Sequence, residues 1–199
     1  MRAAFALILL TMAAFAQDPS AIASAEAACG PKGVNFDVKD DNSQHNIGQP
    51  EAGKALVYVI QDIGAVNCIG GCITTKIAVD GGWVGVNHHN SYLFFAIDPG
   101  EHHLCANWQS RVARMSRVIG LAHFTAEASK VYYFRTRLLG VGGPTFFDID
   151  SIDSDMGRFF VASIPLSSWS GVRPGSARKA GSQTRAKARS VDARWPSHS

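Results

Sequence analysis

The sequence predicts an all-β protein, an antiparallel β-sandwich of about seven to eight strands with short helical turns. Short runs of β-branched and aromatic residues alternate with turns built from Gly, Pro, Asn and Asp. No long segment repeats its apolar residues with the 3.6-residue period of a helix, so the crossover helices of an α/β fold are missing. Together these observations favour two packed sheets.

The first residues predict a secretory signal peptide, residues 1–16. Arg2 gives a positive start, an uncharged run follows to Ala16, and Ala14-Phe15-Ala16 has the small-x-small pattern that signal peptidase cleaves. The run is shorter than the roughly 20 residues that a transmembrane helix needs. We therefore expect an exported protein, periplasmic or extracellular and able to associate with the outer membrane, with no transmembrane segment once the signal is removed.

Residues 17–52 predict an extended or disordered lead-in to the folded domain. The start, up to Ala28, is rich in alanine and suits only a short, weak helix, and Asp37 to Pro50 is polar, typical of a loop rather than a regular element. The domain itself is expected over residues 53–165. Its first strand, Lys54–Gln61, is hydrophobic at nearly every position, which is typical of a central strand.

Further strands follow, each bounded by turn residues. We expect a hairpin of Ile73–Val79 with Trp83–Val86, because Asp80-Gly81 tolerates the positive φ angles of a type I′ turn. The clearest turn signal is Pro99-Gly100, and it predicts a second hairpin, of Ser91–Ile97 with His102–Trp108 around residues 98–101. The remaining elements are a pair of strands, Gly120–Ala126 with Val131–Leu138 around residues 127–130, a strand at Thr145–Asp150, and a helical turn capped by Ser154.

The last segment, residues 170–199, predicts a disordered basic tail. It holds seven Lys or Arg residues against the single acid Asp192, although the whole chain has a formal net charge of only +3. Gly, Ser, Ala and Arg dominate it, and no apolar face can be drawn. Such a tail can contact anionic surfaces. Nucleic acid is not an expected partner, because an exported protein rarely meets it.

Four cysteines remain after signal removal, namely Cys29, Cys68, Cys72 and Cys105. An even count in an exported chain predicts two disulfides, with three possible pairings. In the loop-entropy description a Cys29–Cys105 bridge would stabilise the fold by about 4.5 kcal/mol, against about 2 kcal/mol for a Cys68–Cys72 ring. Because Cys68 and Cys72 form a CxxxC rather than a CxxC motif, a thiol redox protein is only an alternative.

The histidines offer the one candidate metal cluster. His102 and His103 are neighbours on one strand and therefore point to opposite faces. His103 can share a face with Cys105, and a metal-binding or hydrolytic protein using His103 with His88 or His89 is an alternative reading. The sequence has no Gly-x-Ser-x-Gly or His-Glu-x-x-His motif. We therefore expect no catalytic residue, no cofactor and no metal.

Four motifs in register resemble the bacterial domain-of-unknown-function 2846 family, over roughly Gly53 to Ser163. They are GKALVYV at residues 53–59, VDGGWVG at 79–85, DPGEH at 98–102 and ASKVYYFR at 128–135. Ser129 replaces the usual glycine of the last motif. The resemblance implies an exported sandwich of the prealbumin (transthyretin) kind, with a PGEH hairpin similar to that of PEGA and carboxypeptidase-regulatory-like modules. It implies no activity, so no catalytic residue is carried over.

These observations predict a non-enzymatic module of the cell envelope. It would be supported by disulfides and would bind an envelope protein or a polysaccharide.

Overall fold

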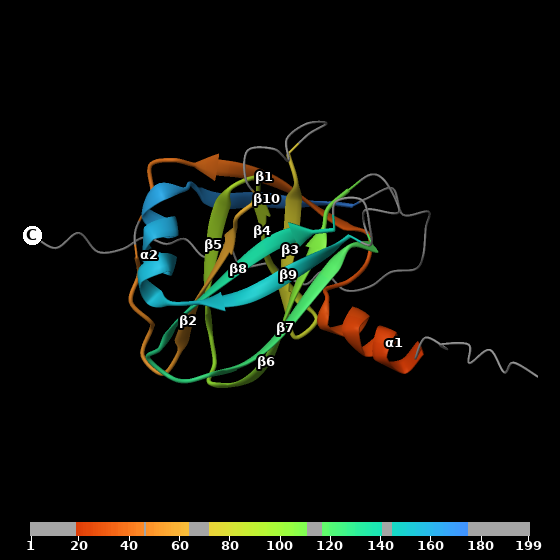
Figure 1. Ribbon diagram of the computed structural model, residues 1–199, viewed down its shortest axis with the longest axis horizontal. Coiled ribbons are helices and arrows are strands. Elements are labelled where there is room, and N and C mark those ends of the chain that lie inside the picture. The colour runs from red at the N-terminus through yellow and green to blue at the C-terminus, as the bar shows by residue number, and fades with distance from the viewer. Residues whose placement is uncertain (1–18, 46, 64–71, 111–116, 141–144, 175–199) are drawn as a thin grey trace, which may run out of the picture.

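The computed structural model describes residues 19–45, 47–63, 72–110, 117–140 and 145–174 (Figure 1). The predicted signal peptide, Cys68 and residues 175–199 of the predicted tail lie outside them. The described part forms ten strands in two sheets and two helices, which confirms the all-β sandwich. Its elements are α1 (Pro19–Ala28), β1 (Val34–Asp41), β2 (Ala55–Gln61), β3 (Thr74–Val79), β4 (Gly82–His88), β5 (Ser91–Ile97), β6 (Gly100–Trp108), β7 (Ile119–Ala126), β8 (Val131–Leu139), β9 (Phe146–Ile152), α2 (Ser154–Ser163) and β10 (Leu166–Pro174).

The strands divide into a six-stranded sheet, in the order β1-β10-β5-β2-β8-β9, and a four-stranded sheet, in the order β4-β3-β6-β7. Most neighbours are antiparallel. The pairs β2–β8 and β10–β5 are parallel, the latter through a single pair of residues. The sandwich is therefore largely, but not wholly, antiparallel.

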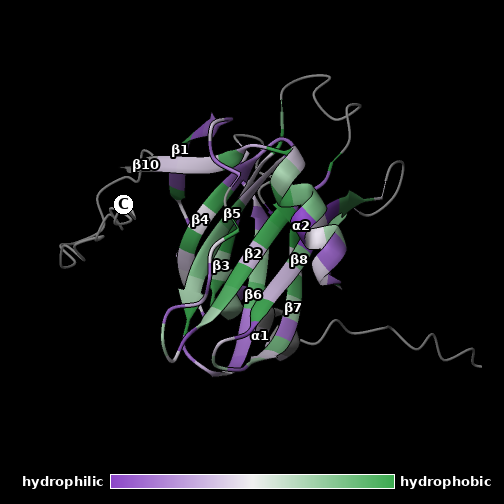
Figure 2. Ribbon diagram, turned by 90° about the vertical axis from the view of Figure 1, so that its left-hand side faces the viewer, coloured by the Kyte–Doolittle hydropathy of each residue, from purple (hydrophilic) through white to green (hydrophobic). Residues whose placement is uncertain are grey.

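Strand β2 lies inside the six-stranded sheet, between β5 and β8, and is mostly hydrophobic (Figure 2). Every one of its residues is buried. Val57 and Val59 face the core between the sheets. Tyr58 and Ile60 face the other way, into a second apolar layer beneath helix α2. Burial on both faces explains why the strand is hydrophobic almost without interruption, and the predicted central position is confirmed.

The prediction of a hairpin at Pro99-Gly100 is wrong. Strand β5 pairs with β2 and β10 in one sheet, whereas β6 pairs with β3 and β7 in the other. The turn therefore carries the chain across the sandwich, and Leu93 and Leu104 meet in the core between the sheets. The predicted pairing around residues 127–130 is wrong in the same way, because β7 and β8 belong to different sheets. A turn signal specifies only that the chain reverses. A hairpin within one sheet and a connection between the two sheets both satisfy it.

The hairpin of β3 and β4 is confirmed. Val79 pairs with Gly82, and the two residues between them, Asp80 and Gly81, have φ angles of 49° and 80°. These positive values match the type I′ turn that the Asp-Gly pair predicts.

Two strands were not predicted. Val34–Asp41 is a regular strand, β1, where the sequence favours an irregular lead-in, and β10 includes residues 170–174 of the predicted tail. The two pair with each other, with β1 at the edge of the sheet. An edge strand buries few residues, so its sequence can be polar. Helix α2 is also longer than a turn, and its N-cap is Asp153, whose carboxylate accepts hydrogen bonds from two backbone N–H groups.

Candidate functional site

The outer face of the four-stranded sheet carries a pocket lined by polar and aromatic side chains. Side chains alternate along a strand, so Ile77 of β3 points into the core and Lys76 points outward. On β6, Leu104 likewise points inward and Cys105 outward. The outer face thus presents Lys76, Cys105 and Asn107, and the end of α1 and the chain after it cross over these residues.

We call this crossing segment, residues 26–35, the N-terminal strap. A disulfide between Cys29 and Cys105, with Cα atoms 5.2 Å apart, fixes it to β6. Two hydrogen bonds add to this: the Gly81 N–H donates to the Ala28 carbonyl at 3.1 Å, and the Trp83 indole N–H donates to the Pro31 carbonyl at 3.1 Å. The strap is therefore attached along its length, covalently and through the backbone.

Gly30 lets the strap approach the sheet. A Cβ atom at this position would overlap the indole of Trp83. Since any side chain would push the strap outward, the spacing between strap and sheet depends on glycine here.

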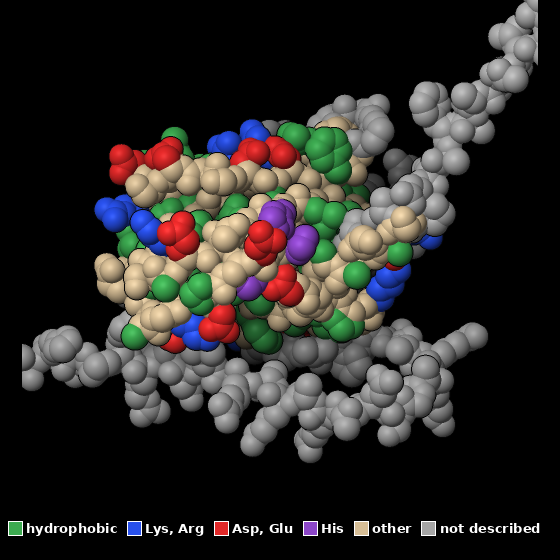
Figure 3. Space-filling model, turned by 90° about the horizontal axis from the view of Figure 1, so that it is seen from below, with side chains coloured by type: hydrophobic (Ala, Val, Ile, Leu, Met, Phe, Trp, Pro, Cys, Tyr) green, Lys and Arg blue, Asp and Glu red, His purple; other side chains and the backbone are tan. Residues whose placement is uncertain are grey.

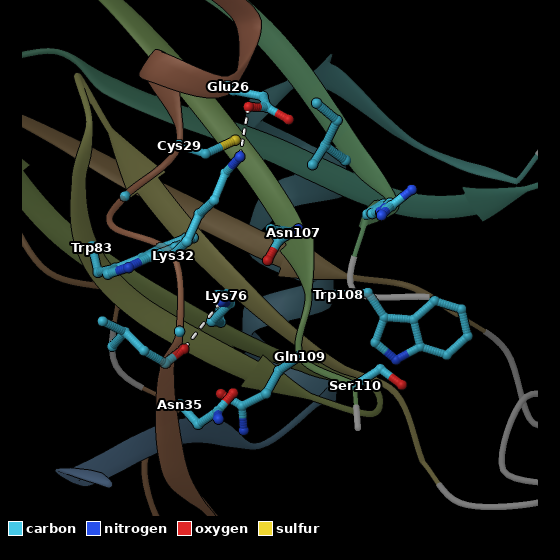
Figure 4. Close-up of a pocket in the computed structure, with 15 residues that line it drawn as sticks. Glu26, Cys29, Lys32, Asn35, Lys76, Trp83, Asn107, Trp108, Gln109 and Ser110 are labelled. Atoms are coloured by element: carbon cyan, nitrogen blue, oxygen red, sulfur yellow. Dashed lines mark hydrogen bonds and ion pairs between the residues drawn. The ribbon is translucent and has the colours of Figure 1, made fainter. Parts of the chain in front are cut away.

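A pocket of about 700 Å³, which we call the strap pocket, lies between the strap and the sheet (Figure 4). This volume falls in the range of pockets that hold small ligands. Polar and aromatic side chains line it, among them Asn35, Lys76, Trp83, Asn107, Gln109 and Arg117. Gln109 is held rigidly, because its amide accepts from the Phe36 N–H at 2.7 Å and donates to the Phe36 carbonyl at 2.8 Å.

Lys76 is the unusual member of this lining, since it is only 6% exposed. Its Nζ donates to the Val34 carbonyl at 3.1 Å and lies 4.4 Å from the centroid of the Trp83 ring. Burial lowers the pKa of Lys76 below its ordinary value, because removal from water disfavours the charged form. No carboxylate of the described residues lies within 4.0 Å of this Nζ.

A second polar cluster lies at the β3–β4 turn, on a face where histidines gather beside acidic side chains (Figure 3). His102 Nδ1 is 2.7 Å from Asp80 Oδ2, and its Nε2 is 2.9 Å from the Asp98 carbonyl. Both partners accept hydrogen bonds, so the doubly protonated imidazolium satisfies both. Partial burial alone would lower the pKa of His102, but these acceptors outweigh it and raise the pKa.

The same contacts act on Asp80 in the opposite direction. Burial alone would raise the pKa of Asp80, whereas the His103 N–H, which donates at 2.9 Å, and His102 together lower it. Aspartate and imidazolium therefore stabilise each other as a charged pair.

The metal candidates do not come together. His88 pairs with Thr74 of β3. The backbone of His103 instead bonds to Asp80, which follows Thr74 by six residues. At about 3.3 Å per residue, His88 and His103 are about 20 Å apart. His88 Nδ1 instead lies 3.0 Å from Asp40 Oδ2, and His89 occupies the next turn with a φ angle of 53°.

The His103 ring lies 4.9 Å from the ring of His123 on the neighbouring strand. Within the described ranges no group of three or more His, Cys, Asp or Glu side chains is arranged to hold a metal ion.

The cysteines are paired as far as the structure describes them. Besides the Cys29–Cys105 bridge, Cys72 is disulfide-bonded, and Cys68 lies outside the described residues. Disulfides are typical of proteins that fold in an oxidising compartment. No helix of the described part is long and apolar enough to cross a membrane.

Sequence reasoning missed Lys76 and the strap. Lys76 stands at an outward position of its strand, where a lysine is ordinarily solvated. Its burial depends on the segment that crosses above it, and the one available signal was the possible Cys29–Cys105 pairing.

Comparison of the chain with protein-family models, with curated proteins and with solved structures finds no match in any of the three. The resemblance to the domain-of-unknown-function 2846 family therefore stays a prediction.

Proposed function

We propose that this chain is an exported, non-enzymatic binding module of the cell envelope, related to the domain-of-unknown-function 2846 family, and that a polysaccharide segment binds in the strap pocket. The pocket itself supports the proposal, because a strap held by a disulfide covers a partly open pocket of about 700 Å³ lined by amide, cationic and indole groups. Amide and ammonium groups hydrogen-bond to the hydroxyl groups of sugars.

We favour a polysaccharide over an envelope protein. Stable protein interfaces bury roughly 800 Å² on each partner and are mostly broad surfaces, whereas this site is a concave pocket of small-ligand size. A protein partner would be expected to contact the rim rather than enter it.

The test is calorimetric titration of the mature protein with soluble oligosaccharides, neutral (cellotetraose, chitotetraose) and acidic (tetragalacturonate). Asn35 lies exposed at the mouth of the pocket, so Asn35→Trp should block entry and weaken binding by more than about tenfold. Lys39→Trp is the matched control, because Lys39 is exposed on the same strand but does not line the pocket. Equal binding by both variants, or no binding of any sugar by the unmodified protein, would refute the proposal.

A further inference from the structure

The charge of Lys76 lies in the pocket without an ionic partner among the described residues. An ammonium group has three N–H donors, and the structure gives one of them to the Val34 carbonyl. The Trp83 ring contributes an attraction without a negative charge. Two donors and a full positive charge therefore remain for something else in the pocket.

Other charges near the pocket do not neutralise Lys76. Glu26 is the acidic residue of the lining, and its carboxylate binds Lys32 Nζ at 2.7 Å. Arg117 adds another cation to the lining. The pocket lining thus has three cationic side chains, Lys32, Lys76 and Arg117, and a single carboxylate, which is already paired with Lys32.

Burial of an unpaired charge is unfavourable, and a lysine ordinarily avoids it by extending its ammonium group into water. Lys76 does not do so, because the strap crosses above it and the Val34 carbonyl binds its Nζ. A ligand with a negative charge would supply the missing counter-ion at a desolvated position, where charge-assisted hydrogen bonds are strong.

We propose that the strap pocket is an oxyanion site, in which Lys76 Nζ binds a carboxylate or phosphate group of an acidic polysaccharide and Arg117 adds positive charge at the same pocket. This rests on the proposed function and narrows it to a charged class of ligand. A carboxylate and a phosphate ester offer the same chemistry to a lysine, which acts as a point charge.

The experiment compares tetragalacturonate with its methyl ester, which has the same rings and no charge. The unmodified protein should bind the acid at least about tenfold more tightly, as expected for a hydrogen bond to a charged group. Lys76→Met keeps the length of the side chain and removes the charge, so it should lose most of the preference for the acid, leaving only the weaker contribution of Arg117. Lys76→Arg should keep the preference for the acid.

Lys32→Met is the matched control. Lys32 lines the same pocket and carries the same charge, but its side chain is 81% exposed and pairs with Glu26. Removing an exposed, paired charge should change the affinity for the acid by less than about threefold. An equal loss in the Lys32 and Lys76 variants would overturn the assignment to Lys76.

The outcomes separate this inference from the proposed function. If acid and ester bind the unmodified protein equally well, the oxyanion site is refuted and the polysaccharide pocket stands. If inorganic phosphate or monomeric galacturonate binds in a Lys76-dependent way but no oligosaccharide does, the oxyanion site stands and the polysaccharide function is refuted. If nothing binds, both are refuted.

Competition by inorganic phosphate shows which anions the site accepts. If phosphate displaces bound tetragalacturonate, the site binds oxyanions in general. If tetragalacturonate stays bound, the site is selective for carboxylates. The comparison of acid and ester uses only the unmodified protein, so it can refute the oxyanion site even if Lys76→Met does not fold.

Discussion

The outer faces of the two sheets are covered in opposite ways. Helix α2 covers the six-stranded sheet with apolar contacts, where the buried Val161 packs against Tyr58 and Tyr133. The strap covers the four-stranded sheet through a disulfide and hydrogen bonds, over a pocket whose lining includes Lys76.

The difference shows what each cover is suited to do. An apolar cover excludes water and is stabilised by the area that it buries. Gly157 of α2 lies so close to Tyr133 that an added Cβ would overlap the ring, and this close contact leaves no room for a ligand. A cover over polar groups buries less apolar area, so a covalent bond can provide the stability that packing does not, while the space beneath stays open.

The largest effect is expected from the disulfide. Replacing Cys29 and Cys105 together by alanine removes a bridge that spans 76 positions in the sequence, and the loop-entropy description predicts a loss of about 4.5 kcal/mol in the free energy of unfolding. Urea unfolding of the double variant measures this. Reduction of the protein is a less specific test, because Cys72 is disulfide-bonded as well. A loss below about 1 kcal/mol would show that the strap is held mainly by its other contacts.

An intermediate effect is expected on the opposite face. Val161→Ala should cost about 2 kcal/mol, because it removes buried methyl groups and leaves a cavity beneath α2. Phe159 lies on the same helix but is 63% exposed, so Phe159→Ala should change the stability by less than about 0.5 kcal/mol. Urea unfolding of both variants tests whether burial holds this cover. Similar losses in the two variants would contradict the comparison.

The sequence was informative where a residue's role is local. The nearly continuous hydrophobicity of Lys54–Gln61 predicts a central strand, and Asp80-Gly81 predicts its own turn geometry. Pro99-Gly100 predicts a reversal, which occurs, but the partner strand depends on residues far away in the sequence. Local patterns therefore located most strands and misassigned two of their pairings.

The candidate site was less predictable for the same reason. Lys76 is buried because residues more than 40 positions earlier cross above it, as the hydrogen bond to the Val34 carbonyl shows. Strands β1 and β10 were missed because their polar outer residues resemble loop and tail sequence, and they form by pairing with each other. Features created by contact between distant segments leave little trace in periodicity.

The smallest effect is expected at the turn that joins the strap to the sheet. The His102–Asp80 pair holds this turn, and the Gly81 N–H of the turn donates to Ala28 of the strap. His102→Gln should lower the stability by up to about 1 kcal/mol, because Asp80 is half exposed and solvent weakens the pair.

The pH dependence of the unfolding free energy identifies this contribution. The pKa of His102 is raised in the folded protein, so its contribution is fully present below the unfolded value of about 6.5 and is lost as the pH rises through the folded pKa. The pKa of Asp80 is lowered, so its contribution is present above about 3.8 and is lost as the pH falls through the folded pKa. The gap between the unmodified protein and His102→Gln should therefore be widest near pH 5 to 6 and close at alkaline pH.

Asp80→Asn is the partner variant for this measurement, because asparagine tolerates the positive φ angle of the turn. It removes the same charge pair, so it should flatten the stability profile over the same pH range. The double variant should then lose no more pH dependence than either single variant. Additive losses would show that His102 and Asp80 act separately, and that the strap on this face is held by its disulfide and backbone contacts without help from the ion pair.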